Sequence, residues 1–433
     1  MINIAFYLDN AKLSKINWLN ILDGNPGVGG SEYEIVLLSY MLSRRKNYNI
    51  IIFAHHIDNF PDVMHIKKVK NINEAIRYAY EINIKYFIFK DDPRWIKLGY
   101  LENIPNGLYI IPWCHNFLTT ERLNYYANIS NVRSVICVGR EQAELYRDHK
   151  LFKKIDYIYN GFPFPKTPNK NLVPISERNN IVTYIGSIMP FKGFHIIAKA
   201  WPLIVKAVPD AQLYVIGSGK VYDVEKEMGR YGIADQHYEE IFMPYLTDCN
   251  GAILNNVHFM GKMGAEKSDI LKITKVGVPN PSGDTETFGI GAIEFEMYGC
   301  EVVTKRCCGY LDTVFNKKNL YKSRNSATLA KYVIKALKSP VSNYDYQYQY
   351  ILNNFDIEKI TDDWEYLFME LEKGNSKIHD LNKSISNINF RWKWFRLIYA
   401  YINHLFNYHL PCINSWSENK LISHIKWLRD QRY

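Results

Sequence analysis

The chain has 433 residues, of which 47% are hydrophobic and 22% are charged, and its formal net charge is +9. This composition excludes a disordered or fibrous protein, and the length exceeds what one ordinary core can bury, so we expect two domains. The charge is uneven, because residues 376–433 hold nine Lys and Arg against three Asp and Glu. A net +6 therefore lies in the C-terminal tail, and the body is only mildly basic.

The cysteine pattern and the N-terminus bear on the compartment. The seven cysteines are scattered, odd in number and without a C-x-x-C pair, which favours free thiols in a reducing compartment. The first ten residues, MINIAFYLDN, are typical of a strand rather than a signal peptide, and no run of about 18 apolar residues occurs. We expect a cytoplasmic protein.

The first half of the chain alternates strands and helices. A glycine loop that contains Gly29 and Gly30 precedes an expected helix over Glu32–Ser43, an arrangement that points backbone N–H groups at a phosphate. His115 follows the fourth strand, where ligands bind in open α/β sheets. The expected strands are Ile2–Leu8, Asn49–Ala54, Lys85–Lys90, Leu108–Pro112, Ser134–Val138 and Asp156–Tyr159, with a helix over Glu141–His149.

The second half repeats this pattern after a proline-bearing segment at residues 162–178. A loop containing Ser187 and Lys192 follows the first strand of this half. The expected strands are Ile181–Ile185, Gln212–Ile216, Val257–Phe259 and Val276–Val278, and the expected helices are Phe194–Val208 and Lys267–Ile273. Alternation of this kind predicts a parallel, doubly wound sheet in each half.

The stretch Pro279–Val303 combines two carboxylates with a glycine turn. Glu286 precedes an expected helix over Ala292–Tyr298, and Glu294 comes eight residues later, about 12 Å along a helix. Gly299 is expected to end that helix in the left-handed region. Two carboxylates beside a helix N-terminus suit a ligand that carries hydroxyls and phosphates together.

In their order along the chain, several motifs resemble those of the GT4-type retaining glycosyltransferases. They are GVGGSE at 27–32, His115 after a strand, SVICVGREQAELY at 134–146, YIYNGF at 157–162, YIGSIMPFKG at 184–193, the paired glutamates, and FDIEKITDDWEYLF at 355–368. The resemblance covers residues 1 to about 373. It implies an α/β protein of GT-B fold, with two Rossmann-like doubly wound domains facing a central cleft and a basic aromatic helical tail.

The resemblance also implies a division of the chain. The expected parts are an N-terminal acceptor domain (1–165), a linker (166–179), a nucleotide-sugar-binding domain (180–345), helices that cross back to the N-terminal domain (346–375) and the tail (376–433). The implied function is transfer of a sugar, of the hexosyltransferase type, from a nucleotide-sugar donor to a glycan or lipid-linked acceptor in bacterial surface polysaccharide assembly.

The family implies the roles of the site residues. Glu286 would bind hydroxyls of the donor sugar, His115 would lie near its reacting carbon, and Lys192 would neutralise the leaving diphosphate. Glu294 would bind the ribose hydroxyls. The implied donor-binding set is Gly29, Gly30, Ser187, Lys192, Lys262, Thr287, Phe288, Gly289, Ile290 and Glu294. We expect no metal and no cofactor, because Lys192 takes the electrostatic role of a cation.

One position departs from the family pattern. Ser187 stands where the family usually has an arginine, and a diphosphate normally attracts two cations. Lys262, Lys220 and Arg140 are candidates for the second cation.

The tail has two basic aromatic segments, at residues 389–408 and 420–432. Basic helices with Trp and Phe lie at membrane interfaces, so one hypothesis is peripheral attachment to an anionic membrane surface at the inner face of the cell membrane. The alternative is a helical hairpin packed on the N-terminal domain or on a second subunit, and binding of nucleic acid is disfavoured. A chain that ends near Lys373 is expected to fold.

Two other functions stay open. A GT-B nucleotide-sugar epimerase would use the same donor pocket, and a non-catalytic GT-B partner subunit would need no catalysis. Turnover of the donor without acceptor identifies the first. Tolerance of Glu286→Gln identifies the second.

Overall fold

The computed structural model describes residues 1–220, 227–264, 266–341, 343–381, 393–408 and 410–418. It divides into two compact units, each described here by itself. Unit 1 comprises residues 1–163 and 355–433, and unit 2 comprises residues 164–354. The segment 166–179, expected as a linker, is part of unit 2, where the Arg178 guanidinium donates to the carbonyl oxygens of Val173, Thr274 and Tyr298.

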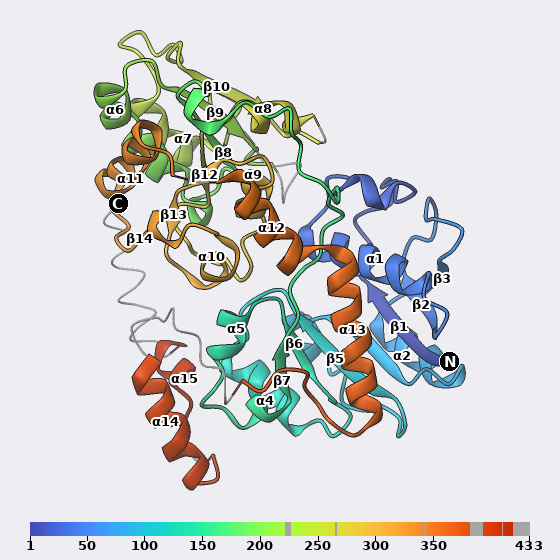
Figure 1. Ribbon diagram of the computed structural model, residues 1–433. Helices are drawn as coiled ribbons and strands as arrows, with labels where there is room; N and C mark the ends of the chain where they lie inside the picture. Colours follow the sequence, from blue (N-terminus) through green and yellow to red (C-terminus); the bar gives the residue numbers. More distant parts are fainter. Residues whose placement is uncertain (221–226, 265, 342, 382–392, 409, 419–433) are drawn as a thin grey trace. The chain divides into compact units, whose positions relative to one another are not determined.

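Unit 1 is built on a seven-stranded parallel sheet with the strand order β3-β2-β1-β4-β5-β6-β7 (Figure 1). The strands are β1 (Ile2–Leu8), β2 (Tyr48–Ala54), β3 (His65–Lys68), β4 (Tyr86–Lys90), β5 (Tyr109–Cys114), β6 (Val135–Cys137) and β7 (Ile155–Tyr157). Most read as continuous apolar runs because helices cover both faces of a parallel sheet. The edge strand β3, HIKK, is polar, and for that reason the apolar pattern does not reveal it.

The helices of unit 1 lie between these strands and at the end of the chain. They are α1 (Gly30–Ser43), α2 (Ile72–Glu81), α3 (Pro93–Lys97), α4 (Thr120–Asn128), α5 (Arg140–Glu144), α13 (Ile357–Glu372), α14 (Lys393–Leu405) and α15 (Ile413–Glu418). The helix expected over Glu141–His149 is wrong in length. It ends at Glu144, and the His149 imidazole instead accepts from the N–H of Leu151 and begins a separate 3-10 turn.

Unit 2 repeats the same winding. Its five-stranded parallel sheet has the order β10-β9-β8-β11-β12, and a small two-stranded sheet pairs β13 with β14. The strands are β8 (Ile181–Ile185), β9 (Gln212–Ile216), β10 (Val257–Gly261), β11 (Val276–Pro279), β12 (Glu301–Val302), β13 (Thr304–Lys305) and β14 (Leu320–Tyr321). The expectation of two doubly wound parallel domains is confirmed.

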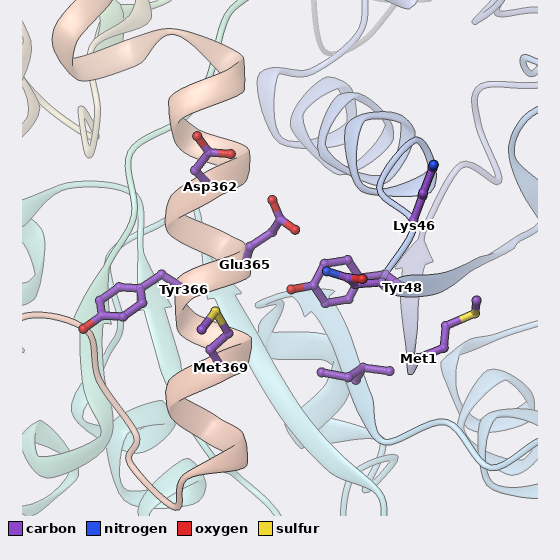
Figure 2. A pocket seen from close by; sticks show the side chains of 9 residues that line it. Met1, Lys46, Tyr48, Asp362, Glu365, Tyr366 and Met369 are labelled. Carbon is purple, nitrogen blue, oxygen red and sulfur yellow. The ribbon is translucent and has the colours of Figure 1, made fainter.

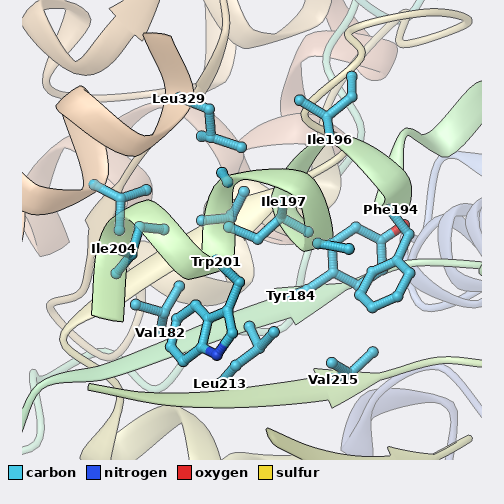
Figure 3. Packing of buried hydrophobic residues seen from close by; sticks show 14 of the residues in the cluster. Val182, Tyr184, Phe194, Ile196, Ile197, Trp201, Ile204, Leu213, Val215 and Leu329 are labelled. Atoms are coloured by element: carbon cyan, nitrogen blue, oxygen red, sulfur yellow. The ribbon is translucent and has the colours of Figure 1, made fainter. Parts of the chain in front are cut away.

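The core of unit 2 lies between its sheet and two helices. Trp201 of α6 (Phe194–Ala207) is fully buried, and Figure 3 shows it beside the strand residues Val182 and Leu213, whereas Leu329 of α11 (Ser326–Lys338) lies on the opposite side of α6. The remaining helices are α7 (Gln236–Phe242), α8 (Lys267–Ile273), α9 (Ile290–Glu296), α10 (Cys308–Thr313) and α12 (Tyr344–Phe355). A buried apolar face of this size fixes the positions of the loops that follow β8 and β11.

The chain passes from one unit to the other twice, after residue 163 and before residue 355. The two unit 1 segments next to these points are joined by backbone hydrogen bonds. The N–H of Phe162 donates to the Phe355 carbonyl at 2.9 Å, and the N–H of Ile357 donates to the Phe162 carbonyl at 2.9 Å. A Cβ at Gly161 would lie 3.1 Å from the Ile357 Cα, so only glycine allows the two backbones to approach this closely.

The first residues of the tail belong to the core of unit 1. Leu381 is 2% exposed, and the buried Asp156 carboxylate accepts from the N–H groups of Ile378 and His379 at 2.6 and 3.0 Å. Removal of residues 376–381 would leave this buried carboxylate without those donors, at a cost of about 1–3 kcal/mol for each group left unpaired. A chain that ends near Lys373 would lack these contacts, and its folding stays a prediction.

We predict that Gly161→Ala lowers the free energy of unfolding by about 1–3 kcal/mol, because the new methyl group overpacks the contact with Ile357 and Ile360. Urea unfolding followed by circular dichroism measures this change. Gly30→Ala is the matched control, since a Cβ at Gly30 meets nothing within 4 Å. Equal midpoints for the two variants would contradict the predicted crowding.

Candidate functional site

The strand order of unit 2 places two loops beside each other at the carboxyl ends of its strands. β8 lies at the centre, β9 pairs on one side of it and β11 on the other. The crevice between β8 and β11 is the point where the winding reverses, and open α/β sheets bind ligands there. The loop after β8 carries Ser187 and Lys192, and the loop after β11 carries Glu286.

These loops meet through an ion pair. The Lys192 Nζ lies 3.1 Å from the Glu286 Oε2, and the Asn280 Nδ2 donates to the same oxygen at 2.8 Å. The two side chains of the ion pair are only 19% and 14% exposed. The Glu286 Oε1 has no hydrogen-bond partner in the part of unit 2 that the structure describes. One carboxylate oxygen is thus fixed by the protein, and the other remains for a ligand.

The loop before Glu286 is held in a rare backbone conformation. Thr285 has φ 57°, in the left-handed region that a β-branched residue seldom adopts. The Ser282 hydroxyl donates to the Phe191 carbonyl at 2.7 Å, and the Asn280 Nδ2 donates to the Asp284 carbonyl at 2.9 Å. These contacts tie the loop after β11 to the loop after β8 and fix the direction of the Glu286 side chain.

Close backbone packing supports the same loops. A Cβ at Gly193, where φ is 69°, would lie 2.7 Å from the Ser282 nitrogen, and one at Gly217 would lie 1.8 Å from the Gly186 carbonyl oxygen. Larger residues would push the loops apart. The glycines of this region therefore allow the approach that brings Lys192 to Glu286.

Glu294, on α9, makes a second ion pair that the sequence analysis missed. The Lys267 Nζ, at the start of α8, lies 2.5 Å from the Glu294 Oε1, and Glu294 raises the pKa of Lys267. The side chains are 28% and 25% exposed. Like Glu286, Glu294 is therefore held by a lysine through one oxygen. A fixed carboxylate that keeps a second acceptor oxygen can bind a hydroxyl group of a ligand.

The other predicted residues of unit 2 take several positions. Phe288 and Thr287 are buried, Gly289 has φ 93° and caps α9, and Ile290 is its first residue. Ser187 is 7% exposed, and its hydroxyl has no hydrogen-bond partner among the residues that the structure describes. Lys262 follows β10 at the sheet edge, two strands from β8, so the strand order does not bring it beside Lys192.

Unit 1 has its own reversal point, between β1 and β4. There the Lys90 Nζ lies 2.7 Å from the Glu32 Oε1, and a Cβ at Gly29 would lie 2.2 Å from the Glu32 Oε2. Gly30 begins α1 beside them. The sequence analysis used Glu32 only as the end of a motif and gave no role to Lys90. Proximity to a glycine loop was the signal that could have found both.

His115 follows β5, the strand next to β4, as expected. Its ring centroid lies 4.7 Å from that of Trp113. Burial, with a smaller contribution from the Lys90 cation, lowers the pKa of His115 to about 3. The imidazole is therefore neutral at physiological pH, and it can exchange a hydrogen bond but does not act there as a cation.

A hollow of about 730 Å³ lies elsewhere on unit 1 (Figure 2). Its walls include Ile2 and Tyr48, the first residues of β1 and β2, and Asp362, Glu365 and Tyr366 of α13. It therefore lies at the amino ends of the strands, opposite the edge that carries Lys90 and His115. Among the residues described, no group of three or more His, Cys, Asp or Glu could hold a metal ion.

Comparison with known proteins finds a family model that matches part of the chain. Residues 179–339, most of unit 2, match the family model of the group 1 glycosyl transferases. A phosphatidyl-myo-inositol mannosyltransferase of Propionibacterium freudenreichii subsp. shermanii is 24% identical over 222 residues, 49% of each chain. The chain thus spans about half the length of this curated relative.

Solved structures share the fold over most of the chain. Anabaena Alr3699/HepE, solved with UDP and glucose, has a TM-score of 0.61 at 15% identity and covers 86% of this chain and 100% of its own. A glycosyltransferase from Rickettsia africae ESF-5 has a TM-score of 0.63 at 13% identity, covering 86% and 99%. The chain therefore has the GT-B fold, with a helical C-terminal region.

Glu296 of α9 makes the stability of unit 2 depend on pH. Its side chain is buried, its Oε1 accepts from the N–H of Phe315 at 2.7 Å, and burial raises its pKa to about 8. The folded state keeps this proton while the unfolded state loses it near the usual value of about 4.5. The stabilisation is full below that value and is lost as pH rises through about 8.

We predict that Glu296→Gln flattens this dependence, because an amide keeps the acceptor for Phe315 and has no proton to lose. Wild type should lose on the order of 1 kcal/mol of unfolding free energy per pH unit between about pH 5 and 8 relative to the variant. Urea titrations at several pH values measure it. Parallel pH curves for the two proteins would contradict the assignment.

Proposed function

We propose that this protein is a GT4-type retaining glycosyltransferase that moves a hexosyl group from a nucleotide-diphosphate sugar to a glycan or lipid-linked acceptor. The observation that carries the proposal is the Lys192–Glu286 pair at the reversal point of unit 2, where one glutamate oxygen has no partner among the residues that the structure describes. The match of residues 179–339 to group 1 glycosyl transferases and the complex of the Anabaena neighbour with UDP and glucose support it.

The two glutamates act as hydroxyl anchors. Glu286 is oriented by Lys192 and Asn280 and binds hydroxyls of the transferred sugar, and Glu294 is oriented by Lys267 and binds the ribose. Neither acts as a nucleophile or a proton carrier. Between the two glutamates in the sequence lie four further residues that contact the donor. They are Thr287 and the backbone N–H groups of Phe288, Gly289 and Ile290.

Lys192 stabilises the charge that develops on the leaving group. The bond between the anomeric carbon and the phosphate oxygen breaks, and the acceptor oxygen bonds to that carbon on the same face. The acceptor proton goes to the leaving phosphate. An ammonium group that is already positioned costs no reorganisation as negative charge appears on the phosphate. No metal or cofactor is required in this proposal.

Ser187 takes the place of the arginine that the family pattern leads us to expect. Its buried hydroxyl, without a partner among the described residues, donates to a phosphate oxygen of the donor. Lys262 supplies charge at longer range. His115 donates a hydrogen bond to the transferred sugar as a neutral imidazole, consistent with its lowered pKa. For Gly29 and Gly30, in the loop before α1, the proposed role is backbone contact with a nucleotide sugar.

We predict that Lys192→Ala lowers kcat by about 10²–10³-fold, because an electrostatic contact to the leaving group is lost. The assay measures release of nucleoside diphosphate and of glycosylated product from a panel of UDP-, GDP- and TDP-sugars. Lys206→Ala, an exposed lysine at the end of α6, is the control and should match wild type. A Lys192→Ala variant of wild-type activity would refute the role. Conversion of the donor sugar to its epimer without acceptor would favour an epimerase instead.

We further propose that the tail attaches the protein to an anionic membrane at the cytoplasmic face, where surface polysaccharide precursors are assembled. On one face of α14, Trp394, Ile398, Tyr401 and Leu405 are 58–75% exposed. On the other face, Arg396 lies 3.2 Å from Asp148 and Asn403 donates to the Asp148 carbonyl at 2.8 Å. The helix is thus docked on unit 1 with its apolar side outward.

This arrangement suits a membrane interface. An amphipathic helix with an apolar face of Trp, Tyr and Leu and a net basic tail binds anionic lipid by burial and by charge. No helix of the described part is long and apolar enough to cross a membrane. The second basic segment of the hypothesis, 420–432, lies outside the described residues, as do Phe390, Arg391 and Trp392.

We predict that Trp394→Asp with Ile398→Asp abolishes co-sedimentation with vesicles of 30% phosphatidylserine in phosphatidylcholine and leaves circular dichroism unchanged. Both side chains are exposed, so folding is not affected. Leu203→Asp with Met369→Asp, two other exposed apolar residues, is the matched control and should sediment as wild type. Sedimentation of wild type and tail variant to the same extent would refute the membrane proposal.

A further inference from the structure

A second group of charged side chains gathers at the reversal point of unit 1 and is not used by the proposed donor site. Asp9 follows β1, His55 follows β2, and Asp92 and Arg94 follow β4. These are three adjacent strands, β2-β1-β4, and their carboxyl ends share one edge of the sheet. Ligands of doubly wound sheets bind at this edge, beside the strand where the winding reverses.

The group is a connected network. An Arg94 terminal nitrogen donates to the Asp9 Oδ2 at 2.7 Å and to the Asp92 Oδ2 at 2.8 Å, and the Arg94 Nε donates to the Asp92 Oδ1 at 2.9 Å. The His55 Nε2 lies 3.3 Å from the Asp9 Oδ1 and 3.1 Å from the Tyr7 hydroxyl. The network therefore spans the ends of all three strands.

The framework beneath the network is rigid. Asn10 is fully buried, and its Oδ1 accepts from the N–H groups of His55 and His56 at 2.8 and 3.1 Å. The Arg94 guanidinium lies over the Trp95 ring at 5.0 Å, and the indole of Trp95 donates to the Lys90 carbonyl at 3.0 Å. Side chains held in this way are preorganised, which lowers the entropic cost of binding a ligand.

Two polar groups of the network have no partner in the described part of the chain. They are the second terminal nitrogen of Arg94, a donor, and the Nδ1 of His55. The Arg94 side chain is 58% exposed, so this donor is accessible from solvent. A fixed carboxylate that is flanked by an N–H donor and an imidazole nitrogen can form hydrogen bonds with two hydroxyl groups of a sugar.

The charge of the network selects among ligands. Asp9 and Asp92 contribute two negative charges and Arg94 one positive charge, so these three side chains together carry a net charge of −1. The neighbouring Lys90–Glu32 and Arg122–Asp91 pairs are each neutral overall. A phosphate or carboxylate on the ligand would therefore meet like charge, whereas an uncharged sugar would not.

We propose that Asp9, His55 and Arg94 form the acceptor subsite, and that it takes an uncharged, hydroxyl-bearing sugar rather than a uronate or a phosphate group. The role as acceptor subsite rests on the proposed transfer reaction, whereas the binding of a sugar by these residues is a property of unit 1 alone. Any anionic group of the acceptor, such as a lipid-linked diphosphate, lies outside this subsite. These residues bind and position the acceptor and take no part in breaking the donor bond.

The test compares neutral and acidic sugars on the full chain. Saturation-transfer NMR measures Kd for the methyl α-glycosides of glucose, galactose and mannose and for the glucuronate and galacturonate counterparts, with UDP, GDP or TDP present. We expect wild type to bind at least one neutral glycoside about tenfold or more tighter than either uronate, as like-charge repulsion at a partly buried site requires. Uronates that bind as tightly as the neutral sugars would overturn the proposal.

Variants test the charge argument in both directions. Asp9→Asn removes one negative charge and should reduce the ratio of the uronate Kd to the neutral-glycoside Kd. Arg94→Gln removes a positive charge and a donor, so it should weaken binding of the neutral sugar and increase this ratio. Arg77→Gln, an arginine of α2 with a 64% exposed side chain, is the matched control and should leave every Kd unchanged. Circular dichroism melts check that each variant is folded.

The outcomes separate this inference from the proposed function. If a nucleoside diphosphate binds but wild type binds no glycoside, or if Asp9→Asn and Arg94→Gln leave the glycoside Kd unchanged, the subsite is wrong and the transferase proposal stands. If no nucleoside diphosphate binds while the neutral glycosides bind in the expected pattern, the subsite stands as a sugar site and the transferase proposal fails.

Discussion

All strands of a parallel sheet end at the same edge, and both groups of candidate site residues depend on this constraint. Both units begin with a strand that becomes central, wind outward on one side and then restart on the other. The loops that meet at the reversal point come from positions about 90 residues apart in unit 2, at Lys192 and Glu286, and about 60 apart in unit 1, at Glu32 and Lys90. In each unit a lysine and a glutamate join there. The ion pairs have a positioning role, since pairs of partly buried charges add little net stability.

A large part of the fold could be predicted from the sequence. Continuous apolar runs give the buried parallel strands, and the bounds of β1, β8, β9 and α8 agree with expectation because their patterns are strong. Glu286 was predicted from its place before a helix N-terminus, His115 from its place after a strand, and Lys192 from the resemblance to a glycosyltransferase family. Their roles stay predictions. The fold class followed from the alternation of strands and helices.

Other parts could not be predicted, for identifiable physical reasons. β3 is a polar edge strand, and the helix after residue 140 ends early because His149 starts a separate turn. Lys267 and Asn280 belong to no motif, and only the folded chain shows that they orient Glu294 and Glu286. The network of Asp9, His55 and Arg94 joins residues up to 85 positions apart, so no local pattern announces it. Contacts of long sequence separation are the ones that a single sequence conceals.

The central claim is that Glu286 and Glu294 bind hydroxyl groups at opposite ends of one donor. Isothermal titration of the full chain with a nucleotide sugar and with its free nucleoside diphosphate tests it most directly. The account predicts that Glu286→Gln weakens binding of the nucleotide sugar by about tenfold and leaves the nucleoside diphosphate unchanged, since one charge-assisted hydrogen bond is lost. It predicts that Glu294→Gln weakens both ligands alike. Equal losses for both ligands in Glu286→Gln, or none in either variant, would contradict it.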